Sequence, residues 1–253
     1  MFVGAQSICL AEELKVGIPD LDIFETVFSG EESLAYEVCW TGGIKIGDLF
    51  LQVKKNDIGG YVIHARIKDY GMFRFFYPVD DTFATFVRGR FKLPYRYEVL
   101  QNEGKGDSVT RRLTRYDQQQ LRVRYQRDDE EESLVPVAGT VHNEFSSFYA
   151  TRAMDLVSGN DFIVPTFADK ERNEVKVQVM EKEQLESIIG TVSAIKVMPV
   201  MKFKGLYDKA GDTVIWITDD TCRVPVKINS KILIGSLTAE LVAYDNPACG
   251  KYK

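Results

Sequence analysis

The sequence has very few histidines and none of the common catalytic motifs. Only His64 and His142 occur in 253 residues, and they do not form a two-histidine metal spacing such as H-E-x-x-H. Gly-x-Ser-x-Gly, the P-loop and G-x-G-x-x-G are also missing, so a nucleophile elbow and a nucleotide-binding loop have no local support. We therefore expect a protein without metal, cofactor or enzymatic activity. A hydrolase whose triad is assembled from distant residues is the remaining enzymatic alternative.

The chain also lacks an excess of positive charge and any long apolar run. Lys and Arg number 32 against 37 Asp and Glu, which gives a formal net charge of −5. Sequence-independent binding to nucleic acid depends on neutralising phosphates, so this acidic balance argues against a nucleic-acid partner. No run of about 18 apolar residues is present, and we expect no membrane-spanning helix.

Charged side chains are absent from the first ten positions. Cys9-Leu10-Ala11 resembles the small-residue cleavage site of a signal peptide, with Glu12 as the first mature residue, although no basic stretch precedes it. We expect an exported protein, periplasmic or associated with the outer envelope; the alternative is a frayed apolar N-terminus of a cytosolic protein. Residues 1–11 are then the remnant of a signal peptide, 12–29 an N-terminal arm, and 30–253 a single β domain.

Cysteines with the spacing of a redox or zinc site are missing, because no C-x-x-C occurs. Cleavage after Ala11 would leave Cys39, Cys222 and Cys249. Cys39 lies in an alternating, strand-like run, and we expect it in the core. Cys222 and Cys249 could pair in an oxidising compartment, but two separate thiols are the interpretation that we favour.

Strand patterning is present along most of the sequence. Apolar and polar residues alternate in Ser33–Trp40, and glycine-rich turns separate this run from others at 45–54 and Tyr61–Asp69. Consecutive strands with short turns and no helical crossover form a meander. We predict about a dozen strands in an all-β, mostly antiparallel domain, folded as a strongly curved sheet, half-barrel or barrel with one principal α-helix.

One segment has helical rather than strand-like periodicity. Between residues 145 and 157, bulky side chains recur at three- and four-residue spacing, and Asn143 or Ser146 can cap the start. Arg152 lies on the apolar face of this helix. Because a buried cation must be paired or reach solvent, we predict that Arg152 bonds carbonyls or a carboxylate beneath the helix. The alternative is that it meets an anionic ligand at the mouth of a cavity.

Arginines cluster between residues 88 and 127 and could bind a phosphate, a sugar acid or an anionic head group. The alternative is a solvated sheet face that the acidic run at 128–132 balances. The candidates for this anion patch are Arg96, Arg112, Arg115, Arg122 and Arg124.

Aromatic residues at strand and helix positions could line an apolar cavity, although such residues more commonly form plain core. Trp216 lies in Thr213–Thr218, which is apolar on both faces, so we expect this strand to be central in the sheet and buried on both sides. The candidate ligand-lining residues are Tyr36, Trp40, Phe73, Phe75, Tyr149, Arg152 and Trp216.

Four stretches resemble the bacterial family known as domain of unknown function 3108. The similarity extends over about residues 30–244, and it implies a β fold akin to the half-barrels of lipoprotein carriers, export from a Gram-negative cell, and no assigned activity. The stretches are Gly30-Glu31 with the alternating residues to Trp40 and Ile46-Gly47; Leu93-Pro94; 147–152 with Gly159; and 216–220 with Arg223, Val224-Pro225-Val226, Gly235 and Leu241.

Together these features favour a non-enzymatic binding or scaffold protein of the cell envelope, with an amphipathic or lipid-like ligand. A protein–protein interaction module is the first alternative, because uncovered sheet edges offer free N–H and C=O groups to a partner. A hydrolase is the second alternative, and the residues to test would be Ser146, Ser147, Asp219 and Asp220.

Overall fold

The computed structural model describes residues 14–69, 78–102, 109–168, 170–200, 213–232 and 235–252. These residues form one antiparallel sheet of 14 strands with two α-helices, so the predicted all-β class is confirmed. The elements in chain order are α1 (Leu21–Val27), β1 (Ser33–Trp40), β2 (Ile44–Lys55), β3 (Tyr61–Asp69), β4 (Asp80–Arg88), β5 (Leu93–Asn102), β6 (Val109–Asp117), β7 (Arg122–Arg127), β8 (Ser133–Pro136), α3 (Glu144–Arg152), β9 (Phe162–Ala168), β10 (Glu171–Ser187), β11 (Gly190–Val200), β12 (Thr213–Thr218), β13 (Pro225–Lys231), β14 (Ser236–Asp245) and the 3₁₀ helix η1 (Gly250–Tyr252).

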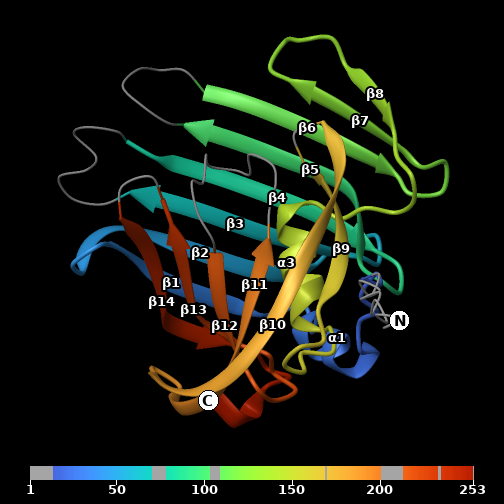
Figure 1. Ribbon diagram of the computed structural model, residues 1–253. Helices are drawn as coiled ribbons and strands as arrows, with labels where there is room; N and C mark the ends of the chain where they lie inside the picture. Colours follow the sequence, from blue (N-terminus) through green and yellow to red (C-terminus); the bar gives the residue numbers. More distant parts are fainter. Residues whose placement is uncertain are drawn as a thin grey trace, which may run out of the picture.

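Two meanders meet in the middle of the sheet. The strands from β1 to β8 follow one another in space, as do those from β9 to β14, and the pairing of β1 with β14 joins the two sets. The sheet does not close, and β8 and β9 lie at its two ends. It curls around α3, which lies between β4 and β9 (Figure 1). This is the strongly curved sheet that the alternating pattern predicts.

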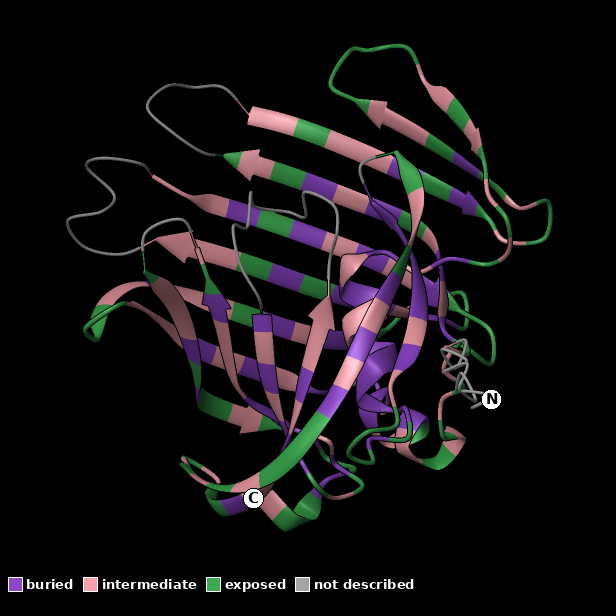
Figure 2. Cartoon of the chain, viewed as in Figure 1, coloured by how far each residue is buried: buried purple, intermediate pink, exposed green. Residues whose placement is uncertain are grey.

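The hydrophobic core fills the inner side of this curl. Alternate residues of the strands point toward α3, and the buried bands repeat along β2 to β6 (Figure 2). Phe145 of α3 lies 5.1 Å from the ring of Phe83 on β4 and 6.3 Å from that of Tyr97 on β5, measured between ring centroids. Around α3 the inner face is therefore packed with side chains.

Asn143 caps α3, as the sequence predicts. Its Oδ1 accepts a hydrogen bond from the amide of Ser146 (2.9 Å), and the Ser146 hydroxyl accepts one from the amide of Asn143 (3.0 Å). This reciprocal pair satisfies two donors that a helix start otherwise leaves free. The Asn143 amide group also donates to the hydroxyl of Thr85 on β4 (2.7 Å), which fixes the helix against the sheet.

The helix ends at Arg152, five residues before the predicted end at 157. The amide of Asp20 donates to the carbonyl of Ala153 (2.7 Å), so the N-terminal segment occupies the position where another helical turn would continue. Met154 and Leu156 are buried in the core without helical geometry. Apolar spacing alone therefore overestimated the length of the helix.

The segment predicted as an N-terminal arm contains a second helix, α1. Asp20 caps it through hydrogen bonds from the amides of Asp22 and Ile23 (2.9 and 3.2 Å). Phe24 and Val27 are fully enclosed in the same core as α3. A seven-residue helix is marginal by itself, and packing against the core stabilises it.

The structure also extends the predicted strands. The sequence pattern predicts a strand over 174–180 and no element over 133–136, whereas in the structure β8 occupies the latter segment and β10 continues to Ser187. The added part of β10 is rich in Glu and Lys and pairs with β11 beyond a bulge between Val179 and Lys182. Its side chains carry little apolar patterning, because this end of the hairpin lies mostly in solvent.

Candidate functional site

An open groove of about 740 Å³ lies on the outer face of the sheet, across β2 to β7. Its outward-pointing side chains alternate with core residues such as Leu51, Val53 and Ile63, so they point away from α3. The side chains on this outer face are Phe50, Gln52, His64, Arg66, Thr82, Ala84, Glu98, Leu100, Arg111, Leu113 and Gln126, with Asp128 at the end of β7.

Strand register arranges these side chains in two parallel rows. Phe50, Arg66, Thr82, Leu100 and Arg111 are successive cross-strand partners in the first row. The second row, formed in the same way, contains Gln52, His64, Ala84, Glu98, Leu113 and Gln126.

The groove is hollow because small residues occupy its centre. Thr82 and Ala84 are on β4, and longer side chains stand on the strands to both sides. Phe50 and Leu100 keep 45% and 40% of their surface exposed, although their face of the sheet is otherwise mostly polar. Exposed apolar side chains that surround a hollow are typical of ligand or partner sites.

The polar side chains of the groove differ in how far they are neutralised. Arg66 forms a bidentate pair with Asp80, with both N···O distances 2.9 Å. The Arg111 side chain has no carboxylate within 4 Å among the described residues. Partial burial and the neighbouring Lys54 lower the pKa of His64, so this imidazole is neutral at pH 7. The groove thus combines the apolar side chains of Phe50 and Leu100 with a cation, Arg111, that no described carboxylate pairs.

Four of the five arginines proposed for the anion patch lie on the same outer face. Arg96, Arg115 and Arg124 are direct cross-strand partners on β5, β6 and β7, in the row next to that of Glu98 and Leu113. Arg122 lies two residues before Arg124, on the same face. The register brings these four arginines together.

The inclusion of Arg112 in this patch is wrong. Arg112 is separated from Arg115 by three residues, an odd number, so its side chain points to the inner face. There its guanidinium donates to the side-chain oxygen of Gln101 (2.6 Å).

The candidate ligand-lining residues do not converge on one cavity in the described part of the chain. Tyr36, Tyr149 and Arg152 are fully enclosed in the core beside α3. Trp40 is half-buried at the last position of β1, whereas the buried residues of this strand, Leu34 and Tyr36, lie in its first half. Phe73 and Phe75 lie outside the described residues.

Trp216 is central in the sheet but is not buried on both sides. Ile215 and Ile217 fill the inner face of β12, whereas Trp216, on the outer face, is only partly buried. Its indole N–H donates to Glu183 (2.5 Å), and the Lys227 ammonium lies 5.8 Å from its ring centroid. The expectation of burial on both sides is wrong because, within the described residues, the outer neighbours of Trp216 include the charged side chains of Glu183 and Lys227 and do not enclose it.

Arg152 forms the predicted contacts with a carboxylate and a carbonyl. Its Nη1 and Nη2 each lie 2.7 Å from an oxygen of Glu32, and its Nε donates to the carbonyl of Arg223 (2.9 Å). Both side chains of the ion pair are 0% exposed. Burial alone would lower the pKa of the Arg152 guanidinium, but the adjoining Glu32 outweighs it and raises that pKa. Glu32 is not among the residues that the sequence predicts to be functional.

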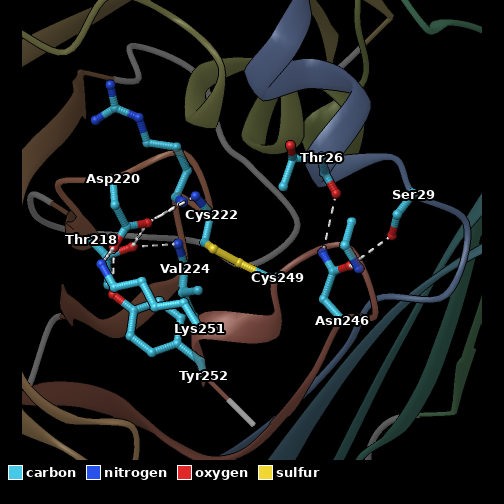
Figure 3. Close-up of a disulfide and its surroundings, with 12 residues drawn as sticks. Thr26, Ser29, Thr218, Asp220, Cys222, Val224, Asn246, Cys249, Lys251 and Tyr252 are labelled. Atoms are coloured by element: carbon cyan, nitrogen blue, oxygen red, sulfur yellow. Dashed lines mark hydrogen bonds and ion pairs between the residues drawn. A yellow bond between two sulfur atoms is a disulfide. The ribbon is translucent and has the colours of Figure 1, made fainter.

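A disulfide joins Cys222 to Cys249, with 5.8 Å between the Cα atoms (Figure 3). The favoured interpretation as two separate thiols is wrong. Asp220 lies beside it, accepts the amide of Cys222 (2.8 Å), and is bonded to Lys251 (2.9 Å) and to the Tyr252 hydroxyl. Asp220 therefore fixes the turn after β12 and holds η1 against it.

Cys39, predicted in the core, is a free thiol and is only half-buried. Cys39 follows a bulge at Val38 in the pairing of β1 with β2, which disturbs the alternation near the end of the strand.

Neither histidine belongs to a triad within the described residues. Burial lowers the pKa of His142 to about 4, and its Nδ1 lies 3.1 Å from the Ser146 hydroxyl, which caps α3. Among the described residues no group of three His, Cys, Asp or Glu side chains is placed to hold a metal ion. No helix in this part of the chain has both the length and the apolarity that a membrane crossing needs.

The fold has a counterpart among solved structures. Among curated proteins, none is matched by the sequence. A β-barrel-like protein from Brucella abortus, of domain of unknown function DUF1849, has a TM-score of 0.59 at 8% identity, over 86% of this chain and 98% of that chain. The hypothetical protein CT021 from Chlamydia trachomatis has a TM-score of 0.38 at 7% identity, over 91% of this chain and 95% of that chain. At such identities the first likeness concerns the fold alone.

The family model described as "Protein of unknown function (DUF3108)" matches residues 35–242. This range contains β2 to β13, α3 and most of β1 and β14, and therefore nearly the whole sheet. The chain therefore belongs to the DUF3108 family of proteins of unknown function.

Proposed function

We propose that this protein is a non-catalytic binding protein of the cell envelope, and that it holds an anionic amphipathic molecule in the outer groove. The observation that carries the proposal is the exposed pair Phe50 and Leu100 around the hollow at Thr82 and Ala84. A volume of about 740 Å³ falls within the range of small-molecule sites. Arg111 supplies a cation at one end, which suits an acidic head group.

A fluorescent acyl probe with a terminal carboxylate tests the groove. The Ala84→Trp variant should weaken probe binding by about tenfold or more, because a large side chain on β4 fills the hollow. Leu100→Ser, at an exposed position, should weaken it by removing apolar contact. Val242→Trp places the same indole on exposed β14 and should bind as the wild type does.

Circular dichroism would establish that each variant is folded. Failure of the folded wild type to bind the probe, or equal binding by the Ala84→Trp and Val242→Trp variants, would refute the groove as the site.

Export is the second part of the proposal, and the Cys222–Cys249 disulfide supports it. Disulfides form and persist in oxidising compartments such as the periplasm and are rare in the cytosol. Cells of the source organism, lysed in an alkylating reagent, should yield the protein in the periplasmic or envelope fraction, with both cysteines protected until a reductant is added. Recovery in the cytosolic fraction with both thiols alkylated would contradict export.

A second candidate function is pairing of a partner strand with β8. The outer edge of β9 is partly covered by bridges to Val16 and His142, whereas β8 pairs with β7 alone among the described residues. Leu134 of β8 is also exposed. A partner bound at this edge would not need the groove, so the Ala84→Trp variant would still bind it.

A further inference from the structure

The arginine row on the outer face brings three positive charges together, and two carboxylates pair with them. Arg96, Arg115 and Arg124 stand directly opposite one another, and like charges in such positions destabilise a sheet. Arg96 pairs with Glu98 on its own strand. A single carboxylate, that of Glu132, bridges the other two, with one oxygen 2.6 Å from Arg115 and the other 3.3 Å from Arg124.

A hollow of about 290 Å³ lies at this place. Arg122 also lines it, and this guanidinium has no carboxylate within 4 Å among the described residues. The lining residues are Arg115, Tyr116, Asp117, Gln120, Arg122 and Arg124. Three guanidinium groups from two strands thus surround one hollow, and only two of them are paired.

We propose that this hollow, the arginine pocket, binds a dianionic phosphate group. The phosphate displaces the Glu132 carboxylate from Arg115 and Arg124. Glu132 ends the acidic run at 128–132, whose other residues are exposed. Its carboxylate bridges two guanidinium groups as a phosphate with two of its oxygens would. A phosphate has further acceptor oxygens, which suit the unpaired Arg122.

The charges of the pocket fit a dianion. With Glu132 withdrawn, three arginines remain against Asp117, whose carboxylate also accepts the amides of Gln119 and Gln120. The remaining charge of +2 matches a phosphate monoester near neutral pH. A guanidinium offers planar paired donors, which is the geometry that phosphate oxygens accept.

The arginine pocket adjoins the groove. Leu113 and Arg115 are two residues apart on the same face of β6, which places them about 7 Å apart along the strand. A molecule with an apolar chain in the groove can therefore reach the pocket with a phosphate head group. This assignment of the phosphate to an amphipathic molecule rests on the proposed function, whereas binding of phosphate itself does not.

Calorimetric titration with inorganic phosphate tests the pocket on the full chain. Arg122→Gln should weaken phosphate binding about tenfold, the effect of one charge-assisted hydrogen bond. Glu132→Gln should strengthen it by a similar factor, because the competing carboxylate is removed. Glu131→Gln removes the same charge from the same loop but from an exposed side chain, and it should leave the affinity unchanged.

Equal effects of the Glu131 and Glu132 substitutions would show a general charge effect and overturn displacement. Absence of phosphate binding in both the wild type and the Glu132→Gln variant would overturn the pocket.

A second titration with dodecyl phosphate distinguishes a lipid-like source from free phosphate. The Ala84→Trp variant should bind dodecyl phosphate more weakly and inorganic phosphate as the wild type does. If it binds both ligands as the wild type does while the Arg122 and Glu132 variants respond as expected, the pocket stands and the proposed groove function fails. If only the Ala84 variant has an effect, the groove stands and the pocket is refuted.

Discussion

Replacing Arg152 by methionine should lower the free energy of unfolding by about 3–5 kcal/mol, because Glu32 would remain as a buried carboxylate without its partner. The ion pair lies beneath α3 and links it to the chain just before β1 and, through the carbonyl of Arg223, to the turn after β12. Asn246, which follows β14, adds a further link to α1, because its side-chain amide donates to the carbonyl of Thr26 at 3.1 Å (Figure 3). The loss is large relative to a typical total stability of about 5–15 kcal/mol.

Arg66→Met is a matched control for this prediction. Arg66 and Asp80 have the same bidentate geometry, but both side chains are well exposed. Exposed pairs contribute about 0–1 kcal/mol, so this variant should unfold nearly as the wild type does. The double variant Glu32→Leu with Arg152→Met should regain much of the loss, since it leaves no unpaired buried charge. An Arg152→Met protein with an unchanged denaturant midpoint would show that the ion pair does not secure α3.

Breaking the Cys222–Cys249 disulfide should cost roughly 3–4 kcal/mol of stability. The bond closes a loop with a sequence separation of 27, and loop-closure entropy for that length gives about 3.5 kcal/mol. Cys249→Ala should therefore lower the melting temperature, and a reductant should lower that of the wild type to a similar value. Cys39→Ala, at a half-buried free thiol, is the matched control.

The disulfide and the ion pair share one neighbour, the backbone of Cys222. The carbonyl of Cys222 lies 3.5 Å from Nη2 of Arg152. Residues that share a partner show non-additive effects, so the combined Arg152→Met and Cys249→Ala variant should lose less than the sum of the single losses. A wild-type melting curve that does not respond to reductant would contradict a stabilising role of the bond.

The sequence by itself determined the class of fold and, where a strand is regular, its inner face. Side chains alternate along a regular strand, so the first part of the run Ser33–Trp40 indicates that Leu34 and Tyr36 point inward before any partner strand is known. The start of α3 was also predictable from the sequence, because its cap is formed by Asn143 and Ser146, which are neighbours in the chain. The pairing of Arg152 was predictable for a different reason: a cation on an apolar helix face requires a partner wherever the chain supplies one.

Only the tertiary structure decided which residues meet across strands and across the fold. The row of Arg96, Arg115 and Arg124 depends on the register of three strands, which no local pattern fixes. The groove requires small residues on β4 to fall between longer ones on its neighbours. Cys222 and Cys249 meet because η1 returns to the turn after β12, and Glu32 was recognisable only as the partner of Arg152. Contacts between residues distant in the chain depend on how all the elements pack together, and alternation along a single strand carries no information about that packing.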